Sequence, residues 1–140
     1  MTALALLLAG RPTFVVTADL TADALDVLRD IGEVRLLGWG AHEWFVSEDA
    51  LRAAVQDAHI LIAGYEPVTA GVLDGAPRLR LIGSVRAEPR TNIDVGAATA
   101  RGIPVLCAPG RTNDAVAEFT LAVILAMARR LVPAVEWMRH

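Results

Sequence analysis

Side chains that can bind a small molecule follow two apolar strand candidates in this chain. Tyr65 and Glu66 come directly after the segment 59–63, and the turn Arg86-Ala87-Glu88 comes after the segment 79–85. In an open parallel sheet, the carboxyl ends of the strands share one edge, and small ligands bind at that edge. A phenol there offers a hydrogen bond and a flat wall. We therefore expect Tyr65, Glu66 and the turn at 86–88 to line a binding site. The alternative for Tyr65 and Glu66 is a loop that packs over the short helix at Thr69.

A further candidate lies where a long apolar helix begins, near residue 112. Thr112 and Asn113 open this helix, and a helix N-terminus favours negative charge on a bound group. Simple N-capping explains the two residue types equally well. Both interpretations stay open on the sequence alone.

The three histidines and the single cysteine suggest no chemistry. His42, His59 and His140 have no serine or carboxylate at a spacing typical of a catalytic triad or a metal site. Cys107 is the only cysteine, so it cannot form an internal disulfide, and we expect it to be a small buried hydrophobic residue. A lone cysteine fits a reducing, cytoplasmic setting.

Composition limits the possible classes. The chain has 140 residues, 54% of them hydrophobic, with 13 basic and 16 acidic side chains and a net charge of −3. This balance lacks the positive charge that nucleic-acid binding needs. The apolar stretch near the N-terminus is too short to span a bilayer, and we assign residues 1–12 to an N-terminal extension. The high apolar content predicts a surface that a partner covers.

Strand and helix patterns alternate along the rest of the chain. Apolar and β-branched runs predict strands at 13–17, 34–37, 59–63, 79–85 and 104–108. Helical spacing predicts helices at 21–31, 48–55, 69–73 and 94–100, with Thr21 and Ser47 as N-caps and Asn92 and Asp94 as caps of the last one. Strands separated by helix-length connections predict a parallel five-stranded sheet with flanking helices.

The last helix differs from the others, because it is apolar on every face. It is expected from 112 to 131, and Pro133 is expected to end or kink it. A helix that is apolar all round must be buried all round, and a single sheet domain covers only one side. We expect a second domain or a second copy of the chain to cover the other side, which predicts a homodimer through residues 112–131. The alternative is that this helix stands away from the sheet domain as a partly disordered arm.

Five blocks of the sequence together resemble one family. They are Leu81-Ile82-Gly83-Ser84-Val85-Arg86, Asn92-Ile93-Asp94-Val95 with Ala97-Ala98-Thr99, Arg101-Gly102-Ile103-Pro104-Val105, Ala108-Pro109-Gly110-Arg111 and Ala115-Val116-Ala117-Glu118-Phe119-Thr120-Leu121. This set is similar to the D-isomer-specific 2-hydroxyacid dehydrogenases. The resemblance implies NAD- or NADP-dependent interconversion of 2-hydroxy and 2-keto acids, in a cleft between a flavodoxin-like domain and a Rossmann domain.

The resemblance also implies roles for the candidate residues. The turn Arg86-Ala87-Glu88 matches the place where this family holds the substrate carboxylate on backbone N–H groups, which form an anion-binding nest. Thr112 and Asn113 match positions that contact substrate or nicotinamide. This turn departs from the commoner glycine-rich version, and Glu88 would repel a carboxylate if it pointed inward. The alternative is a solvated turn with an Arg86–Glu88 or Arg86–Asp94 ion pair.

Other motifs of the family cannot be placed in these residues. The close glycine pair Gly38 and Gly40 has Glu43 where a dinucleotide loop needs its third glycine, and the catalytic Arg, Glu and His of the coenzyme domain have no counterpart. We therefore assign 13–108 to a substrate domain and 109–140 to a hinge and the first helix of an absent coenzyme domain. On this interpretation the chain is truncated and inactive by itself.

A rival interpretation is a non-catalytic flavodoxin-like module. Asp19 follows the first strand, where receiver domains keep acidic residues, but the adjoining acidic partner is missing and the chain contains no lysine. A binding or dimerisation module that shares the fold stays open.

Overall fold

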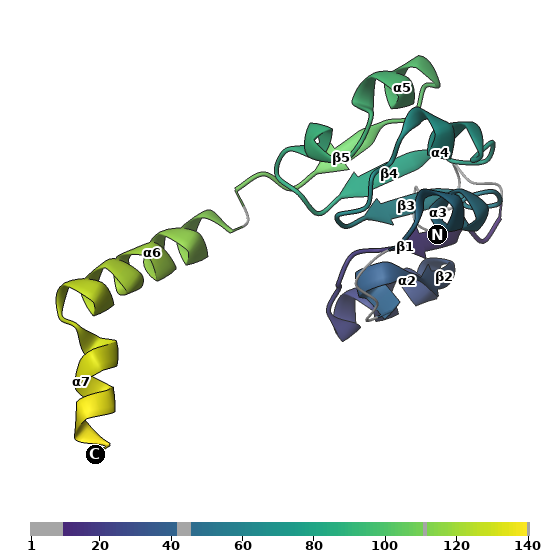
Figure 1. The fold of residues 1–140 in the computed structure, drawn as a ribbon. Coiled ribbons are helices and arrows are strands. Elements are labelled where there is room, and N and C mark those ends of the chain that lie inside the picture. Colours follow the sequence, from purple (N-terminus) through teal and green to yellow (C-terminus); the bar gives the residue numbers. More distant parts are fainter. Residues whose placement is uncertain (1–9, 42–45, 111, 140) are drawn as a thin grey trace. The chain divides into compact units, whose positions relative to one another are not determined.

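Five short segments form one parallel sheet (Figure 1). The computed structural model describes residues 10–41, 46–110 and 112–139. The strands are β1 (Thr13–Val16), β2 (Glu33–Leu36), β3 (Ile60–Ala63), β4 (Leu81–Ser84) and β5 (Val105–Cys107). Their order is β2-β1-β3-β4-β5, with every neighbouring pair parallel, which is the order of flavodoxin-like sheets. The predicted parallel five-stranded sheet is confirmed.

Short helices connect the strands of this sheet. They are α2 (Ala22–Ile31), α3 (Glu48–Ala54), α4 (Ala70–Asp74) and α5 (Val95–Ala100), with 3-10 turns η1 (Gly38–Ala41) and η2 (Pro89–Thr91). The predicted N-caps Thr21 and Ser47 are confirmed, because their hydroxyl oxygens accept from the N–H of Ala24 at 3.4 Å and of Ala50 at 3.2 Å. Each accepted bond satisfies one N–H of a first helical turn.

The two faces of the sheet carry separate apolar clusters. Along β1, Phe14 and Val16 belong to a cluster that Leu28 and Ile31 of α2 help to cover. Val15 belongs to the larger cluster, which takes in residues of α3, α4 and α5. Because successive side chains of a strand point to opposite faces, the apolar residues 14–16 of β1 supply both clusters. The sheet is thereby covered by helices on both faces.

The chain divides into two compact units, Met1–Pro109 and Gly110–His140. The functional assignments of 13–108 and 109–140 stay predictions. Of the proposed N-terminal extension, residues 1–9 lie outside the described residues. Pro12 is buried, and its carbonyl accepts from the N–H of Glu33 at 2.9 Å. No helix in the described ranges is long and apolar enough to cross a membrane.

The second unit holds two helices, α6 (Asn113–Ala128) and α7 (Leu131–Met138). The predicted end of a single helix at residue 131 is therefore wrong, because α6 ends at Ala128. Arg130 adopts a left-handed backbone conformation with φ of 53°, which stops α6 before Pro133 is reached. The proline instead lies in the first turn of α7, where a missing N–H costs no helical hydrogen bond.

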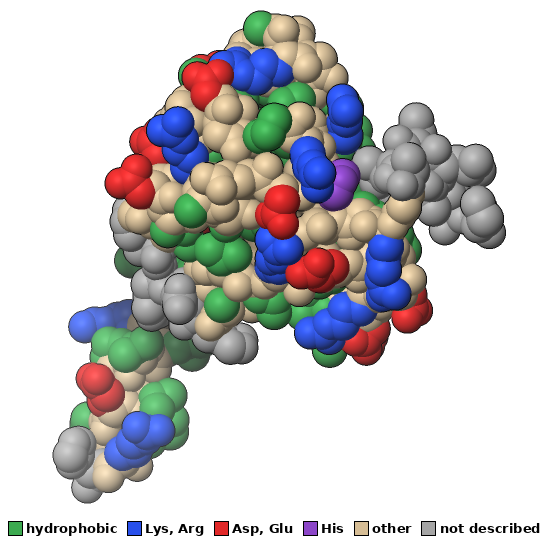
Figure 2. Space-filling view, turned by 90° about the vertical axis from the view of Figure 1, so that its right-hand side faces the viewer, with side chains coloured by type: hydrophobic (Ala, Val, Ile, Leu, Met, Phe, Trp, Pro, Cys, Tyr) green, Lys and Arg blue, Asp and Glu red, His purple; other side chains and the backbone are tan. Residues whose placement is uncertain are grey.

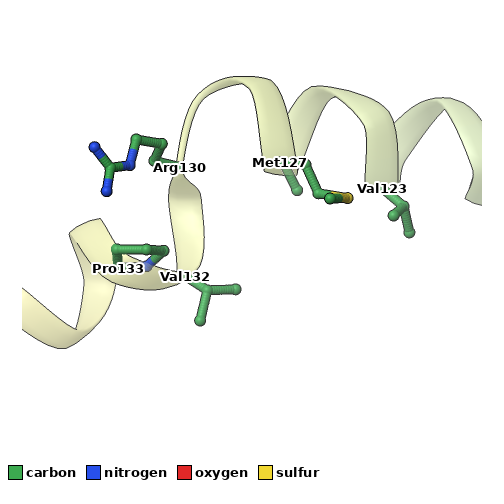
Figure 3. Close-up of a pocket in the computed structure, with 6 residues that line it drawn as sticks. Val123, Met127, Arg130, Val132 and Pro133 are labelled. Atoms are coloured by element: carbon green, nitrogen blue, oxygen red, sulfur yellow. The ribbon is translucent and has the colours of Figure 1, made fainter.

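An apolar hollow of about 450 Å³ lies at the corner between α6 and α7. Figure 3 shows Val123 and Met127 on α6, with Val132 and Pro133 on α7. Within this unit the two helices leave Phe119 70% exposed and Ile124 55% exposed. Apolar side chains of α6 are thus exposed within this unit, but the predicted long apolar helix between domains or subunits is not confirmed.

Candidate functional site

The strand order reverses between β1 and β3, because β2 lies on one side of β1 and β3 on the other. In such sheets, the crevice at the carboxyl ends of these two strands is the usual ligand site. Thr17 follows β1 and is 1% exposed. Its Oγ1 accepts from the N–H of Gly64, which follows β3, at 2.9 Å. This bond joins the two strand ends and forms the floor of the candidate site.

Glycines allow the chain to approach this floor closely. A Cβ on Gly64 would lie 2.9 Å from the carbonyl oxygen of Thr17, and one on Gly40 would lie 2.8 Å from the carbonyl oxygen of Val16. Such distances are closer than a carbon atom tolerates beside a carbonyl oxygen. The pair Gly38 and Gly40, which fails the dinucleotide pattern, therefore has a packing role in η1.

Asn92 connects the loop after β3 to the loop after β4. Its Nδ2 donates to the carbonyl oxygens of Gly64 at 3.2 Å and Glu66 at 3.0 Å. Its own carbonyl accepts from the N–H of Val68 at 2.7 Å. Asn92 was expected to cap α5, and that expectation is wrong, because its side chain turns toward β3. Asp94 is the actual cap, with Oδ1 accepting from the N–H of Ala97 at 2.8 Å.

Glu66 places a buried carboxylate beside this floor. The residue is 6% exposed, and its Oε2 accepts from the N–H of Tyr65 at 3.1 Å. A Cβ on Gly38 would lie 2.6 Å from Oε1 of Glu66, so η1 packs directly on the carboxylate. Burial of a carboxylate is costly without hydrogen-bond donors, and within the described ranges the N–H of Tyr65 is such a donor.

Tyr65 stands at the rim of the site and is 56% exposed. Its ring centroid lies 5.0 Å from that of Trp39, with a tilt of 57°. The guanidinium carbon of Arg86 lies 5.1 Å from the centroid of the Tyr65 ring. The structure thus brings together Tyr65 and Arg86, which the sequence analysis predicts as separate site residues. It adds Trp39, which the sequence analysis does not predict. The sequence signal for Trp39 is its position as an aromatic residue between two glycines.

The turn at 86–88 leaves hydrogen-bond donors available. The N–H of Arg86 donates to Oγ of Ser84 at 3.2 Å. Among the described residues, the backbone N–H groups of Ala87 and Glu88 have no acceptor, and the guanidinium of Arg86 makes no ion pair. Neither of the ion pairs considered from the sequence, Arg86–Glu88 or Arg86–Asp94, is present.

Glu88 does not point into the site. Its Oε1 accepts from the N–H of Arg90 at 3.1 Å, and its carbonyl accepts from Oγ1 of Thr91 at 2.8 Å. The side chain therefore caps η2 in its own turn. The repulsion that an inward Glu88 would exert on a bound carboxylate is avoided by this cap.

Three other sequence expectations concern residues outside this edge. Thr112 occupies the N-cap position of α6 without a side-chain cap bond, so capping does not explain its hydroxyl, and Asn113 is the first residue of that helix. Cys107 is exposed rather than buried, because β5 is the edge strand of the sheet. His59 accepts from the N–H of Thr13 through Nδ1 at 3.1 Å, while His42 and His140 lie outside the described residues.

The side chains with shifted pKa values lie outside the candidate site. Hydrogen bonds from Arg35 to Asp57 and Glu33 raise the pKa of the Arg35 guanidinium, and the same bond to Arg35 lowers the pKa of the Asp57 carboxyl. These side chains are accessible to solvent, so the shifts carry little stability. On the face in Figure 2, basic and acidic side chains are mixed and form no field of one sign.

One protein family matches most of the chain. The family described as "D-isomer specific 2-hydroxyacid dehydrogenase, catalytic domain" matches residues 14–136. A glyoxylate reductase of Thermofilum pendens is 35% identical over 126 residues, which are 89% of this chain and 36% of that protein. The chain thus spans about a third of the length of this curated relative.

Solved structures show the same fold. A protein of Thermus thermophilus aligns with a TM-score of 0.81 and 33% identity, covering 91% of this chain and 40% of that one. An NADPH-dependent glyoxylate/hydroxypyruvate reductase of Sinorhizobium meliloti, solved with NADP and malonate, aligns with a TM-score of 0.70. Its identity is 22%, over 93% of this chain and 38% of that one, so this likeness concerns the fold alone.

We predict that Asn92→Ala lowers the free energy of unfolding by about 1–3 kcal/mol, because the carbonyls of Gly64 and Glu66 lose their donor. Thr91→Ala is the matched control, since it removes an exposed hydrogen bond to the carbonyl of Glu88 in the same loop. It should cost about 0.5 kcal/mol or less. Urea denaturation followed by circular dichroism measures both, and equal losses would contradict the role given to Asn92.

Proposed function

We propose, because this chain belongs to the D-isomer-specific 2-hydroxyacid dehydrogenase family, that it forms the substrate side of an NAD- or NADP-dependent enzyme for 2-hydroxy and 2-keto acids. The observation that carries this proposal is the pair of successive backbone N–H groups at Ala87 and Glu88, which have no acceptor among the described residues. They lie just beyond β4, at the edge where parallel sheets bind ligands. Two such donors suit one carboxylate.

The other rim residues would complete the substrate pocket. Tyr65 offers a flat wall and a phenol, and its loop is held by Asn92 through the carbonyls of Gly64 and Glu66. Glu66 is turned toward the N–H of Tyr65, so we assign it to positioning that loop beneath the substrate. Glu88 contributes its backbone N–H while its carboxylate caps η2.

The coenzyme would supply or accept the hydride when it is bound. In the second unit, the hydroxyl of Thr112 makes no cap bond, which fits a role for Thr112 and Asn113 in contacting nicotinamide or substrate. The 140 residues contain no glycine-rich pyrophosphate loop. We therefore propose that this chain alone does not transfer hydride. An exposed lone Cys107 fits the proposed cytoplasmic setting.

The substrate site is tested by titrating the ¹⁵N-labelled chain with pyruvate. We predict that the amide signals of Ala87 and Glu88 shift most, because their N–H groups receive the carboxylate. Titration with 1-propanol, which has no carboxylate, is the control and should leave both signals in place. Shifts confined to residues far from the ends of β1, β3 and β4 would refute the proposed site.

The coenzyme proposal is tested by isothermal titration calorimetry with NADH. We expect no binding in the micromolar range, because the pyrophosphate has no glycine-rich loop to cradle it. Micromolar binding of NADH by this chain would show that the assignment of these residues to the substrate side alone is wrong.

We also propose that α6 associates with its own copy in a homodimer. Phe119, Ile124 and Met127 are 70%, 55% and 74% exposed, and each Å² of apolar surface left in water forgoes about 25 cal/mol. This exposed helix also favours the second candidate function, a non-catalytic binding or dimerisation module. The pyruvate titration separates the two, since a pure dimerisation module need not bind a 2-keto acid.

The dimer is tested by Ile124→Glu. We predict that this variant is monomeric in light scattering while the circular dichroism of the sheet unit is retained, because a charge would be buried in the apolar contact. Val27→Glu is the control, since Val27 is 60% exposed on α2 of the other unit, and it should leave the dimer intact. A monomeric wild-type chain with an ordered α6 covered by its own residues would disprove the dimer.

A further inference from the structure

We propose that Arg86 is a specificity-determining residue that selects 2-keto and 2-hydroxy acids with a second carboxylate. This inference rests on the proposed function, in which the N–H groups of Ala87 and Glu88 hold the first carboxylate. It adds the substrate class, namely dicarboxylic acids, and the residue that would recognise it.

The guanidinium of Arg86 reaches the neighbouring strand end. Arg86 belongs to the turn after β4, yet its guanidinium carbon lies 5.1 Å from the ring centroid of Tyr65, which follows β3. The Tyr65 ring in turn contacts Trp39 of η1, with 5.0 Å between centroids. The positive charge of Arg86 therefore lies beside a residue of the loop after β3, while the amides of Ala87 and Glu88 belong to the turn after β4. The guanidinium and the amides are two separate groups of donors, one for each carboxylate of a dicarboxylic acid.

This guanidinium is held without being neutralised. A cation over an aromatic face is attracted by the ring but keeps its in-plane N–H donors. Arg86 makes no ion pair in the part of the chain that the structure describes. Its donors are consequently available to a ligand, and their fork matches the two oxygens of one carboxylate.

The acidic residues of the same loops each accept a hydrogen bond from a backbone N–H group, and none of them pairs with Arg86. Glu88 accepts from the N–H of Arg90, Glu66 from that of Tyr65, and Asp94 from that of Ala97. Each carboxylate thus has a backbone donor of its own segment. The side-chain N–H groups of Arg86 have no hydrogen-bond acceptor among the residues that the structure describes.

The test compares two 2-keto acids of the same chain length, 2-oxoglutarate and 2-oxopentanoate, which differ in the second carboxylate. Both are titrated into the ¹⁵N-labelled 140-residue chain at constant ionic strength and pH, and dissociation constants are taken from the amide shifts of Ala87 and Glu88. We expect 2-oxoglutarate to bind about tenfold more tightly, the effect of one charge-assisted contact.

Two variants test whether Arg86 causes the difference between the two dissociation constants. Arg86→Gln should bring the two dissociation constants together while leaving that of 2-oxopentanoate within about twofold, since the amides remain. Arg80→Gln is the matched control, because Arg80 is exposed just before the amino end of the same strand, and it should preserve the tenfold difference. The amide spectrum of each variant shows directly whether it is folded.

The outcomes separate this inference from the proposed function. If both keto acids shift the amides of Ala87 and Glu88 with equal affinity, the substrate site stands and the role of Arg86 is overturned. The same follows if Arg80→Gln abolishes the difference, because the effect would then be one of net charge. If neither keto acid shifts these amides, the proposed substrate site is overturned, and the role of Arg86 with it.

Discussion

The candidate site depends on the hydrogen bonds that the side-chain amide of Asn92 donates. Its two N–H bonds reach the carbonyls of Gly64 and Glu66, so the loop after β3 is fixed by a residue that follows β4. The backbone adds Val68 N–H to Asn92 and Asp94 N–H to Val68, at 2.7 and 2.9 Å. These four bonds add to the pairing of β3 with β4 and join the loop that carries Tyr65 to the segment that follows the turn at 86–88.

The strands themselves could be predicted from the sequence because they are short, rich in apolar or β-branched residues and separated by good helix signals. The caps at Thr21 and Ser47 were recognisable for the same reason, since a hydroxyl before a helical pattern has a local partner two or three residues away. The predicted strand 79–85 is longer than β4, Leu81–Ser84, because the apolar residues Leu79 and Val85 flank the strand.

The site itself was only partly predictable, because its contacts are long-range. Tyr65 and Arg86 could be selected as residues that follow strands, but their contact depends on parallel pairing of β3 with β4. The sequence predicts Asn92 as a helix cap because no neighbouring residue distinguishes an amide that caps its own helix from one that donates to the carbonyl of Gly64. The contact of Trp39 with Tyr65 likewise depends on which loop covers the floor of the site. The exposure of Cys107 depends on which strand lies at the edge of the sheet.

The central claim is that the N–H groups of Ala87 and Glu88 are held open for a substrate carboxylate. Hydrogen exchange of these two amides, measured by NMR with and without a saturating 2-keto acid, tests it most directly. We predict exchange close to that of an unprotected amide in the free chain and clear slowing in the complex, while the N–H of Gly64, bonded to Thr17, stays protected throughout. Protection of Ala87 and Glu88 in the free chain, or no slowing when the keto acid binds, would contradict this claim.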